Sequence, residues 1–276
     1  MTNSVHTNAA AAVALQNLSR TSDRLNDVQN RVSTGLKVQG AKDNAAIWAI
    51  AQSQRADVGA LSAVKQSLDR ATSIADVALS AGESVSDLLN QLKEKIVAAK
   101  DGSLKTQSRQ LLDNDFRALL GAIKSAVDNA AFDGGNLLNG SLTSGIKFLA
   151  NADASSFVTL TSKDLSLSGS ILSLGLADSL LTVTGATAAL TKLDSSITSL
   201  NSALGSIGAQ AKQIQAHSTF VSKLSDTLES GIGNLVDADL AKESARLQAL
   251  QVQQQLGAQA LSIANQAPQI ILSLFK

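Results

Sequence analysis

The sequence contains no cysteine, no tyrosine and only one proline among its 276 residues. The absence of cysteine excludes disulfide scaffolds, thiolate zinc sites and cysteine nucleophiles. Aromatic residues make up 3% of the chain, which is too few to build base-stacking platforms for single-stranded nucleic acid. Because 23 basic residues balance 23 acidic ones, a basic nucleic-acid-binding surface is not expected either. The composition therefore predicts no nucleic-acid partner.

The sequence also lacks the features of a cleaved secretory signal and of a membrane span. A secretory signal places basic residues before its apolar segment, whereas the first basic side chain here, Arg20, follows the apolar run 9–15. No uninterrupted apolar stretch approaches the roughly 18 residues of a transmembrane helix. We therefore expect no membrane insertion. The chain either stays inside the cell or leaves it by a route without a cleaved signal.

Long apolar periodicity is the main positive feature of the sequence. Apolar residues recur in alternating steps of three and four over residues 61–99, 112–130 and 190–235. Such sustained spacing is typical of coiled-coil-like helices, which bury their apolar stripes against one another. The expected fold is mainly α, an elongated antiparallel helical bundle. The residues predicted to form the bundle core are Leu61, Leu68, Leu89, Leu92, Ile96, Phe116, Leu119, Ile197, Leu204, Ile214 and Leu228.

The two ends of the chain carry narrower apolar stripes, rich in alanine at the N-terminus and in glutamine at the C-terminus. Gln254 and Gly257 interrupt the C-terminal stripe. Narrow stripes bury little area, and at roughly 25 cal/mol per Å² this burial scarcely offsets the entropy lost on ordering. We therefore expect both ends to be weakly ordered in a monomer and to need partners. The residues predicted to mediate this association are Leu18, Leu25, Val28, Val32, Leu240, Leu247, Leu250 and Leu261.

Residues 141–188 form a segment rich in serine, threonine, leucine and glycine. Residues 146–148 and 157–161 are predicted to be short strands, joined by a polar turn at 151–156. Leu165, Leu167, Ile171 and Leu174 would extend this small sheet. We expect β structure only in this insert.

No group of residues in the sequence indicates catalysis, metal binding or cofactor binding. The two histidines, His6 and His217, have no neighbouring carboxylate cluster. Residues 133–136 read as a turn, because a calcium loop would need further ligands and a closing glutamate. Neither a nucleophile–base pair nor a phosphate-binding loop is present. The chain is not expected to be an enzyme.

Four short segments near the two ends resemble the bacterial flagellins. They are Val-Ser-Thr-Gly-Leu-Lys at 32–37, Ala-Lys-Asp-Asn-Ala-Ala at 41–46, Asn-Leu-Val-Asp-Ala-Asp-Leu-Ala-Lys-Glu-Ser at 234–244 and Ala-Asn-Gln-Ala-Pro at 264–268. The resemblance covers about residues 4–140 and 190–276. The short middle segment and the pair Ile47-Trp48 resemble the alphaproteobacterial type of this family.

This resemblance implies a subunit that assembles into the extracellular flagellar filament for swimming motility. It implies a terminal coiled-coil domain of the inner tube (1–36 with 237–276) whose helices order on polymerisation. It also implies a helical bundle domain (37–140 with 189–236) and an outward-facing insert (141–188). The implied partners are other copies of the chain, the flagellar export apparatus, an export chaperone, and the cap and hook–filament junction proteins. A hook–filament junction protein and a cytoplasmic coiled-coil scaffold remain alternatives.

Overall fold

The computed structural model describes residues 7–273, and the side chains of residues 7–266. This part of the chain contains five helices and four short strands, so the predicted mainly α fold is confirmed. Residues 1–6 and 274–276 of the expected terminal domain, with His6, lie outside the described residues. The chain divides into two compact units, 1–56 with 228–276 and 57–227. Both boundaries between these units fall within long helices.

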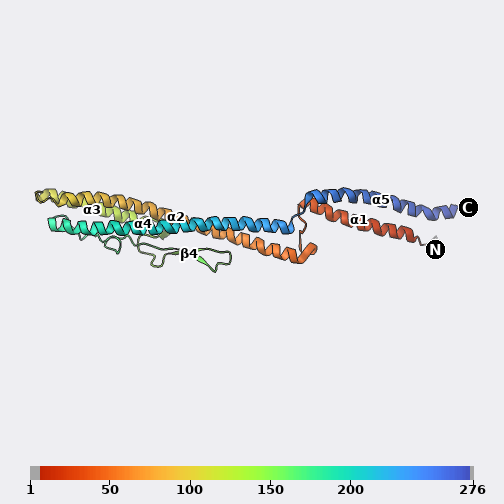
Figure 1. The fold of residues 1–276 in the computed structure, drawn as a ribbon, viewed down its shortest axis with the longest axis horizontal. Coiled ribbons are helices and arrows are strands. Elements are labelled where there is room, and N and C mark those ends of the chain that lie inside the picture. Colours follow the sequence, from red (N-terminus) through yellow and green to blue (C-terminus); the bar gives the residue numbers. More distant parts are fainter. Residues whose placement is uncertain (1–6, 274–276) are drawn as a thin grey trace. The chain divides into compact units, whose positions relative to one another are not determined.

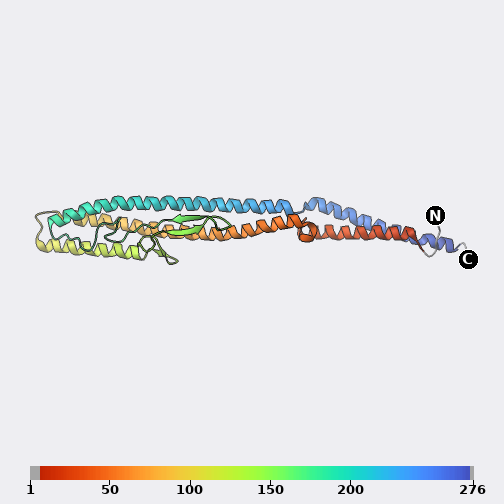
Figure 2. The same ribbon diagram turned by 90° about the horizontal axis from the view of Figure 1, so that it is seen from below.

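The unit of residues 57–227 is built on three helices, α2 (Ala41–Ala99), α3 (Thr106–Asp128) and α4 (Val183–Val236), of which the first and last extend beyond it. Figures 1 and 2 show the three helices side by side in this unit. The turn between α2 and α3 is held by Arg109, a buried residue whose guanidinium donates to the carbonyl oxygens of Ala99 and Asp101. The bond to Ala99 satisfies one of the carbonyl groups that lack a helical partner where α2 ends.

Helices α2 and α4 pack antiparallel within this unit. The side chain of Leu204 occupies the space in which a Cβ atom at Gly82 would lie, only 2.2 Å from Leu204 Cδ2. Further along, Lys93 Nζ lies 2.9 Å from Asp194 Oδ1. Because the position on α4 falls as that on α2 rises, the two helices run in opposite directions. Glycine at position 82 therefore permits a close approach of the two helices.

The core of this unit follows the predicted positions along α2, whereas several core positions on α3 and α4 differ from the predicted ones by one residue. All the positions predicted on α2 are buried. On α3 the buried leucine is Leu120, whereas Leu119 is half-buried. Phe116 and Ile214 are buried as predicted, whereas Ile197, Leu204 and Leu228 are half-buried. On α4 the neighbouring residues Ser196 and Ala203 are buried in place of Ile197 and Leu204, alongside Leu193, Leu200 and Ile207. The buried residues keep the alternating three-and-four spacing but with the steps in the other order, because the core faces of α3 and α4 include polar residues, Asp113 and Ser196, which a search for apolar repeats passes over.

The insert forms a small hairpin that lies against the helices. Strands β3 (Ile146–Leu149) and β4 (Phe157–Leu160) pair antiparallel, with Leu149 opposite Phe157. The Leu149 N–H donates to Ser67 Oγ on α2 (3.2 Å), and the Thr161 N–H donates to Gln210 Oε1 on α4 (2.8 Å). The predicted strands are therefore present, and they contact both long helices.

Two expectations about β structure were wrong. Two-residue strands, β1 (Ala131–Phe132) and β2 (Gly135–Asn136), pair before the insert begins, so that β2 occupies the second half of the predicted turn 133–136. The positive φ of Asp133 and Gly134 lets the chain reverse tightly there. Leu165 and Leu174 do not extend the hairpin. Their side chains are buried, the Leu165 N–H donates to the Leu138 carbonyl, and the Leu174 carbonyl accepts from the Ser168 N–H beside an isolated bridge between Leu167 and Leu172.

A buried carboxylate on α3, that of Asp113, binds the segment that precedes α4. Its Oδ1 accepts from the Leu180 N–H at 2.7 Å, and its Oδ2 accepts from Arg117 Nε at 2.8 Å. Arg117 also donates to the carbonyl of Leu176 at 3.0 Å. Burial raises the pKa of the Asp113 carboxyl, but the hydrogen bonds from Arg117 and Leu180 outweigh this effect and hold the pKa below its usual 3.8.

Substitution Asp113→Asn is expected to lower stability at neutral pH and to weaken its dependence on acid. A carboxyl group whose pKa is depressed by folding stabilises the native state above its unfolded pKa, and this contribution is lost as pH falls below about 3.8. Breaking the buried contacts should cost about 1–3 kcal/mol at pH 7, and less in acid. Urea unfolding at pH 7 and at a pH below about 3.8, followed by circular dichroism, measures the difference in the free energy of unfolding between the variant and the wild-type chain.

Asp115→Asn is the matched control for this prediction. Asp115 contacts Lys95 at 2.8 Å on the surface, where its side chain is 55% exposed. Exposed ion pairs contribute little to stability. If both substitutions changed stability and its pH dependence equally, the assignment of the effect to the buried Asp113 contacts would be wrong.

Candidate self-assembly interface

Helix α1 (Ala9–Thr34) begins and ends at residues that cap it. Asn8 Oδ1 accepts a hydrogen bond from the Ala11 N–H at 3.0 Å, which satisfies one of the free donors of the first turn. At the other end, Gly35 adopts a φ of +73° and its N–H donates to the Arg31 carbonyl. A positive φ is readily adopted only by glycine, so the chain leaves the helix at this residue.

Helix α5 (Leu240–Ser273) also begins after a residue that caps it. Asp239 Oδ1 accepts from the N–H groups of Ala241 and Lys242, each at 3.1 Å. The negative charge of this cap also interacts favourably with the positive end of the helix dipole. The Asp239 of the flagellin-like segment 234–244 therefore acts as a helix cap. Further along, α5 has no ionisable residue from Leu247 to its last described residue.

Helices α1 and α5 pack against each other as an antiparallel pair, which we call the terminal pair. Asn8 Nδ2 donates to the Ala264 carbonyl at 2.7 Å, across 256 residues of sequence. At the opposite end, Arg31 Nη1 lies 3.8 Å from Glu243 Oε1. Gly257 lies against Leu18, whose Cδ1 would be 3.3 Å from an added Cβ atom. The glycine expected to interrupt the stripe is thus part of the seam between the helices.

Within one chain, the terminal pair buries few apolar side chains. Among the predicted association residues, Val28 and Leu250 are buried, and Leu240 is 49% exposed. The others are half-buried: Leu18, Leu25, Val32, Leu247 and Leu261. Because so little aliphatic surface is fully covered, the pair has a narrow seam and only a small hydrophobic contribution to its stability.

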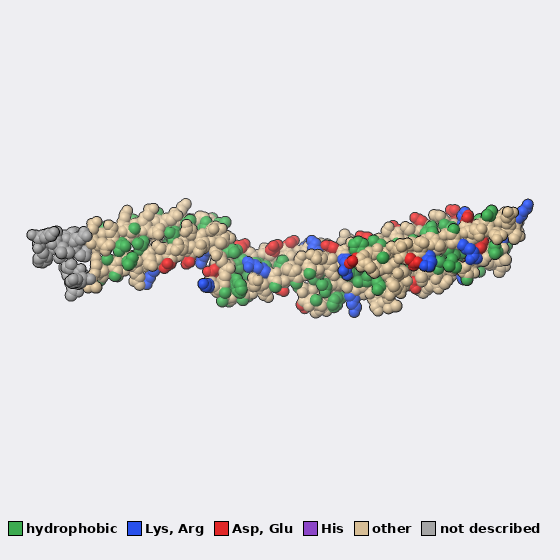
Figure 3. Space-filling view, turned by 180° about the vertical axis from the view of Figure 1, so that it is seen from behind, with side chains coloured by type: hydrophobic (Ala, Val, Ile, Leu, Met, Phe, Trp, Pro, Cys, Tyr) green, Lys and Arg blue, Asp and Glu red, His purple; other side chains and the backbone are tan. Residues whose placement is uncertain are grey.

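The outer faces of the terminal pair carry further apolar side chains. Five of them are more than half exposed: Val13, Leu15, Val252, Leu256 and Ile263. Residues 7–19 and 247–266 include no charged residue, and the parts of these stretches from Asn8 to Leu18 and from Gly257 to Ala264 lie side by side in the pair. In Figure 3, the surface next to the grey atoms accordingly shows hydrophobic and neutral side chains without charged ones. Exposed apolar surface of this kind marks an interaction site.

The two linkers that lead into the terminal pair are hydrogen-bonded to each other. Leu36 and Asp237 form an antiparallel bridge, the Lys37 N–H donates to the Val236 carbonyl at 2.6 Å, and the Ala238 N–H donates to the Gly35 carbonyl at 2.8 Å. The flagellin-like segments 32–37 and 234–244 therefore meet in space and hold the first and last helices in register.

Another flagellin-like segment, 41–46, caps the beginning of α2. The Asp43 carboxylate accepts from the N–H groups of Gln39 (2.8 Å) and Gly40 (3.2 Å). Asn44 leaves helical geometry, with φ −161° and ψ 102°, and its Oδ1 accepts from the Ile47 N–H at 3.1 Å. The regular part of α2 thus starts after Asn44. Asp43 and Asn44 have a structural role at this turn.

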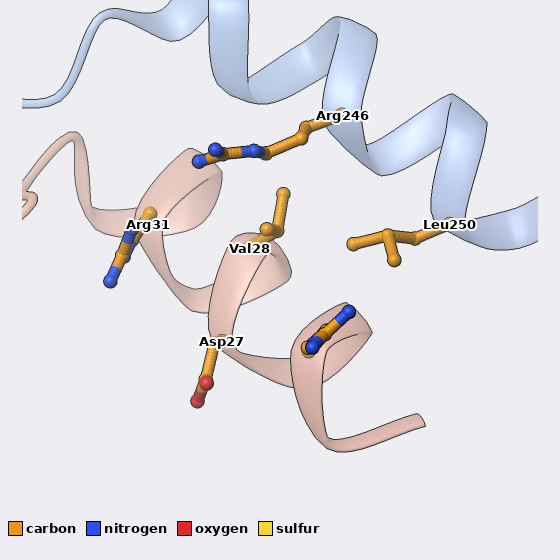
Figure 4. A pocket seen from close by; sticks show the side chains of 6 residues that line it. Asp27, Val28, Arg31, Arg246 and Leu250 are labelled. Carbon is orange, nitrogen blue, oxygen red and sulfur yellow. The ribbon is translucent and has the colours of Figure 1, made fainter. Parts of the chain in front are cut away.

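A groove of about 340 Å³ runs between α1 and α5 on one side of the terminal pair. Val28 and Leu250 extend toward each other across it, as Figure 4 shows. Its charged lining residues are Asp27 and three arginines, Arg24, Arg31 and Arg246. We call this feature the arginine groove.

Among the described residues, no group of three or more potential ligand side chains could hold a metal ion. None of the described helices combines the length and apolar character that crossing a membrane requires. The terminal pair is therefore the strongest candidate for a functional surface in the part of the chain that the structure describes. Its chemistry is that of association with other helices, through apolar and neutral side chains together with one cluster of arginines.

Comparison with known protein families agrees with this description. Residues 5–143 match the bacterial flagellin N-terminal helical region, and residues 190–275 match the bacterial flagellin C-terminal helical region. The chain belongs to the bacterial flagellins. The resemblance inferred from the four short segments is thereby confirmed. This flagellin is a structural subunit of the filament of the bacterial flagellum, the organelle of swimming motility.

Full-length relatives support the assignment. Flagellin FljJ of Caulobacter vibrioides is 54% identical over 275 residues, which cover 99% of this chain and 98% of the relative. A flagellin of Brucella melitensis is 41% identical over 281 aligned positions, with 99% of each chain covered. Their bacteria are alphaproteobacteria, as the short middle segment and Ile47-Trp48 indicated.

Solved structures share the fold at lower sequence identity. The crystal structure of Bacillus cereus flagellin aligns with a TM-score of 0.50 and 20% identity, over 56% of this chain and 88% of that one. A putative flagellar hook-associated protein from Vibrio parahaemolyticus aligns with a TM-score of 0.54 and 15% identity, over 71% of this chain and 100% of that one. These likenesses concern the fold alone.

Some residues of the terminal pair in this flagellin had no role assigned from the sequence. Asn8 links the two helices as well as capping α1, and Glu243 contacts both Arg31 and Arg246, with Arg246 Nη1 at 3.2 Å from its Oε1. Glu243 is the one acidic residue in α5. A single carboxylate in an otherwise nearly uncharged helix could have indicated that it has a specific basic partner. The role of Gly257 depends on Leu18 and could not be found from local sequence.

Proposed function

We propose that this flagellin polymerises by covering the exposed, uncharged faces of its terminal pair with those of neighbouring copies. The observation that carries the proposal is the combination of a narrow internal seam with the exposed aliphatic residues of 7–19 and 247–266. Burying these side chains at a subunit contact supplies free energy that a single copy does not gain. The residues proposed for assembly remain Leu18, Leu25, Val28, Val32, Leu240, Leu247, Leu250 and Leu261.

The terminal helices would become fully ordered only on polymerisation, because the same exposed surface must be covered by neighbouring copies. A helix pair with little buried area is close to balance between hydrophobic gain and conformational entropy. Contacts with neighbouring copies shift that balance toward the ordered helices. Residues 1–36 with 237–276 would then form the inner part of the filament, residues 37–140 with 189–236 the surrounding bundle, and residues 141–188 the outer surface.

The route to the filament is a further part of this proposal. We infer that the chain leaves the cell through the flagellar export apparatus without a cleaved signal, and that a chaperone covers the apolar stripe of α5 beforehand. Cap and hook–filament junction proteins would be its partners at the two ends of the filament. The role is structural, and no catalytic step is assigned to it.

Seeded assembly tests this function. Purified monomer mixed with short filament fragments near neutral pH is expected to lengthen the fragments into uniform filaments, because each added copy buries its terminal pair on the growing end. Pelleted mass and negative-stain electron microscopy measure the growth. A junction protein would leave the fragments short or stop their growth, and a cytoplasmic scaffold would not interact with them. Either result would contradict the proposal.

The junction function is the second candidate, since a hook-associated protein shares the fold. That similarity, at 15% identity, does not distinguish the two functions. The 54% identity to a flagellin over nearly the whole of both chains favours the propagating subunit.

A further inference from the structure

The guanidinium groups of the arginine groove make few contacts within the described chain. Each guanidinium has five N–H donors. The one hydrogen bond that these three groups make to a described atom runs from Arg246 Nη1 to Glu243 Oε1, at 3.2 Å. Arg31 approaches the same oxygen at 3.8 Å, and Arg24 has no ion-pair or hydrogen-bond partner among the described residues. Most donors in the groove are therefore available.

The charge of the groove is also unbalanced. Three arginines line it, against a single acidic residue, Asp27. The adjacent Glu243 carboxylate is buried, with its side chain 9% exposed, and its Oε2 has no hydrogen-bond partner among the described atoms. Glu243 therefore compensates part of the charge of Arg31 and Arg246 from inside the pair. The solvent side of the groove, where Arg24 lies exposed, retains an excess of positive charge.

The groove lies at the border of the surface proposed to be covered on assembly. Arg246 directly precedes the uncharged stretch of α5, and Leu250 belongs both to that stretch and to the lining of the groove. A neighbouring copy that covers the exposed apolar side chains would thus reach the groove as well. Since the chain has no net charge, each copy also offers carboxylates that could neutralise the groove of another.

We propose that the arginine groove receives a carboxylate from a second copy of this chain and so sets the register between terminal pairs. The inference rests on the proposed polymerisation and names the polar contact within it. Apolar helix faces slide past one another with little change in energy, whereas a carboxylate held by a guanidinium has a defined geometry. Charge complementarity of this kind contributes specificity and encounter rate, in addition to affinity.

Exchange of Arg24 for glutamate tests the proposal in the full-length chain. Arg24→Glu removes an intermolecular partner without breaking a described intramolecular contact, so the monomer is expected to fold normally. It should raise the critical concentration for elongation of wild-type seeds by roughly tenfold or more, because a carboxylate then faces a carboxylate. Arg24→Lys, which keeps the charge but loses the planar fork, should have an intermediate effect.

Arg20→Glu is the matched control. Arg20 is exposed on the same helix, one turn away, has no described partner and does not line the groove. This variant makes the same change in charge and should alter the critical concentration by less than about twofold, as expected for an exposed charge without a partner. Circular dichroism of both monomers shows whether the fold is retained.

The outcomes separate this inference from the function on which it rests. Elongation by wild-type chain together with a selective defect of Arg24→Glu supports the groove as an intersubunit contact. Equal behaviour of the Arg24 and Arg20 variants, whether both elongate or both fail, overturns the inference while polymerisation by the wild-type chain still stands. A wild-type chain that does not elongate seeds overturns both.

Discussion

Deleting residues 240–276 is expected to abolish filament formation completely while leaving the unit of residues 57–227 folded. The deletion removes α5, and with it the contacts that hold α1 through Val28 and Asn8. The core of residues 57–227 depends on α2, α3, α4 and the insert, none of which is removed. The expected product is a soluble helical protein that neither forms filaments nor adds to filament ends.

Three measurements check the effect of this deletion. Pelleting and negative-stain electron microscopy should show no filaments, with or without wild-type seeds. Circular dichroism should retain a cooperative thermal transition from residues 57–227, while the helical signal of the terminal pair is lost. The full-length chain, prepared in parallel, is the control for handling and concentration. Filaments of normal appearance from the truncated chain would show that the terminal pair is not the assembly surface.

Substitution of Leu120 by alanine is expected to produce a large loss of stability. Leu120 is fully buried, with 0% exposure, at the position where α3 faces the core. Removing a buried leucine side chain typically costs about 2–5 kcal/mol, because transfer free energy is lost and a cavity remains. Urea unfolding of the monomer, followed by circular dichroism, would show a lower transition midpoint with little change in slope.

Leu119→Ala is the matched control, since it changes the same residue type one position earlier. Leu119 is half-buried, so its removal should cost about half as much or less. The comparison also tests which of the two leucines faces the core. A larger effect at Leu119 than at Leu120 would favour the pattern inferred from the sequence over the packing that the structure shows.

The two leucines illustrate the limit of periodicity. Both are apolar, so a stripe can be drawn through either, and the alternating three-and-four pattern selected Leu119. Seven residues before Leu120, the core face carries Asp113, a buried carboxylate, and a search for apolar repeats passes over it in favour of Leu112. Its burial is satisfied by Arg117 and by the distant Leu180 N–H, and the latter contact is not visible from local sequence.

The terminal pair shows a similar division. Local chemistry identifies its caps, since Asn8, Gly35 and Asp239 are residue types that begin or end helices. The pairing itself joins residues 256 positions apart. The flagellin-like segments indicated that the two ends meet, by resemblance. The contact of Gly257 with Leu18 and the clustering of three arginines depend on the exact alignment of α1 with α5.

The sequence by itself determined the class of the fold, the presence of the long helices, the hairpin in the insert and membership of the flagellins. These properties reside in repeat spacing, capping residues and short motifs, which are local in the chain. Only the tertiary structure decided that Leu120 is buried in preference to Leu119, that Gly257 receives Leu18, and that three arginines share one groove. Each of these depends on how helices distant in sequence are rotated and aligned against one another. A one-residue shift turns a side chain by about 100° around its helix, so such choices are made by packing.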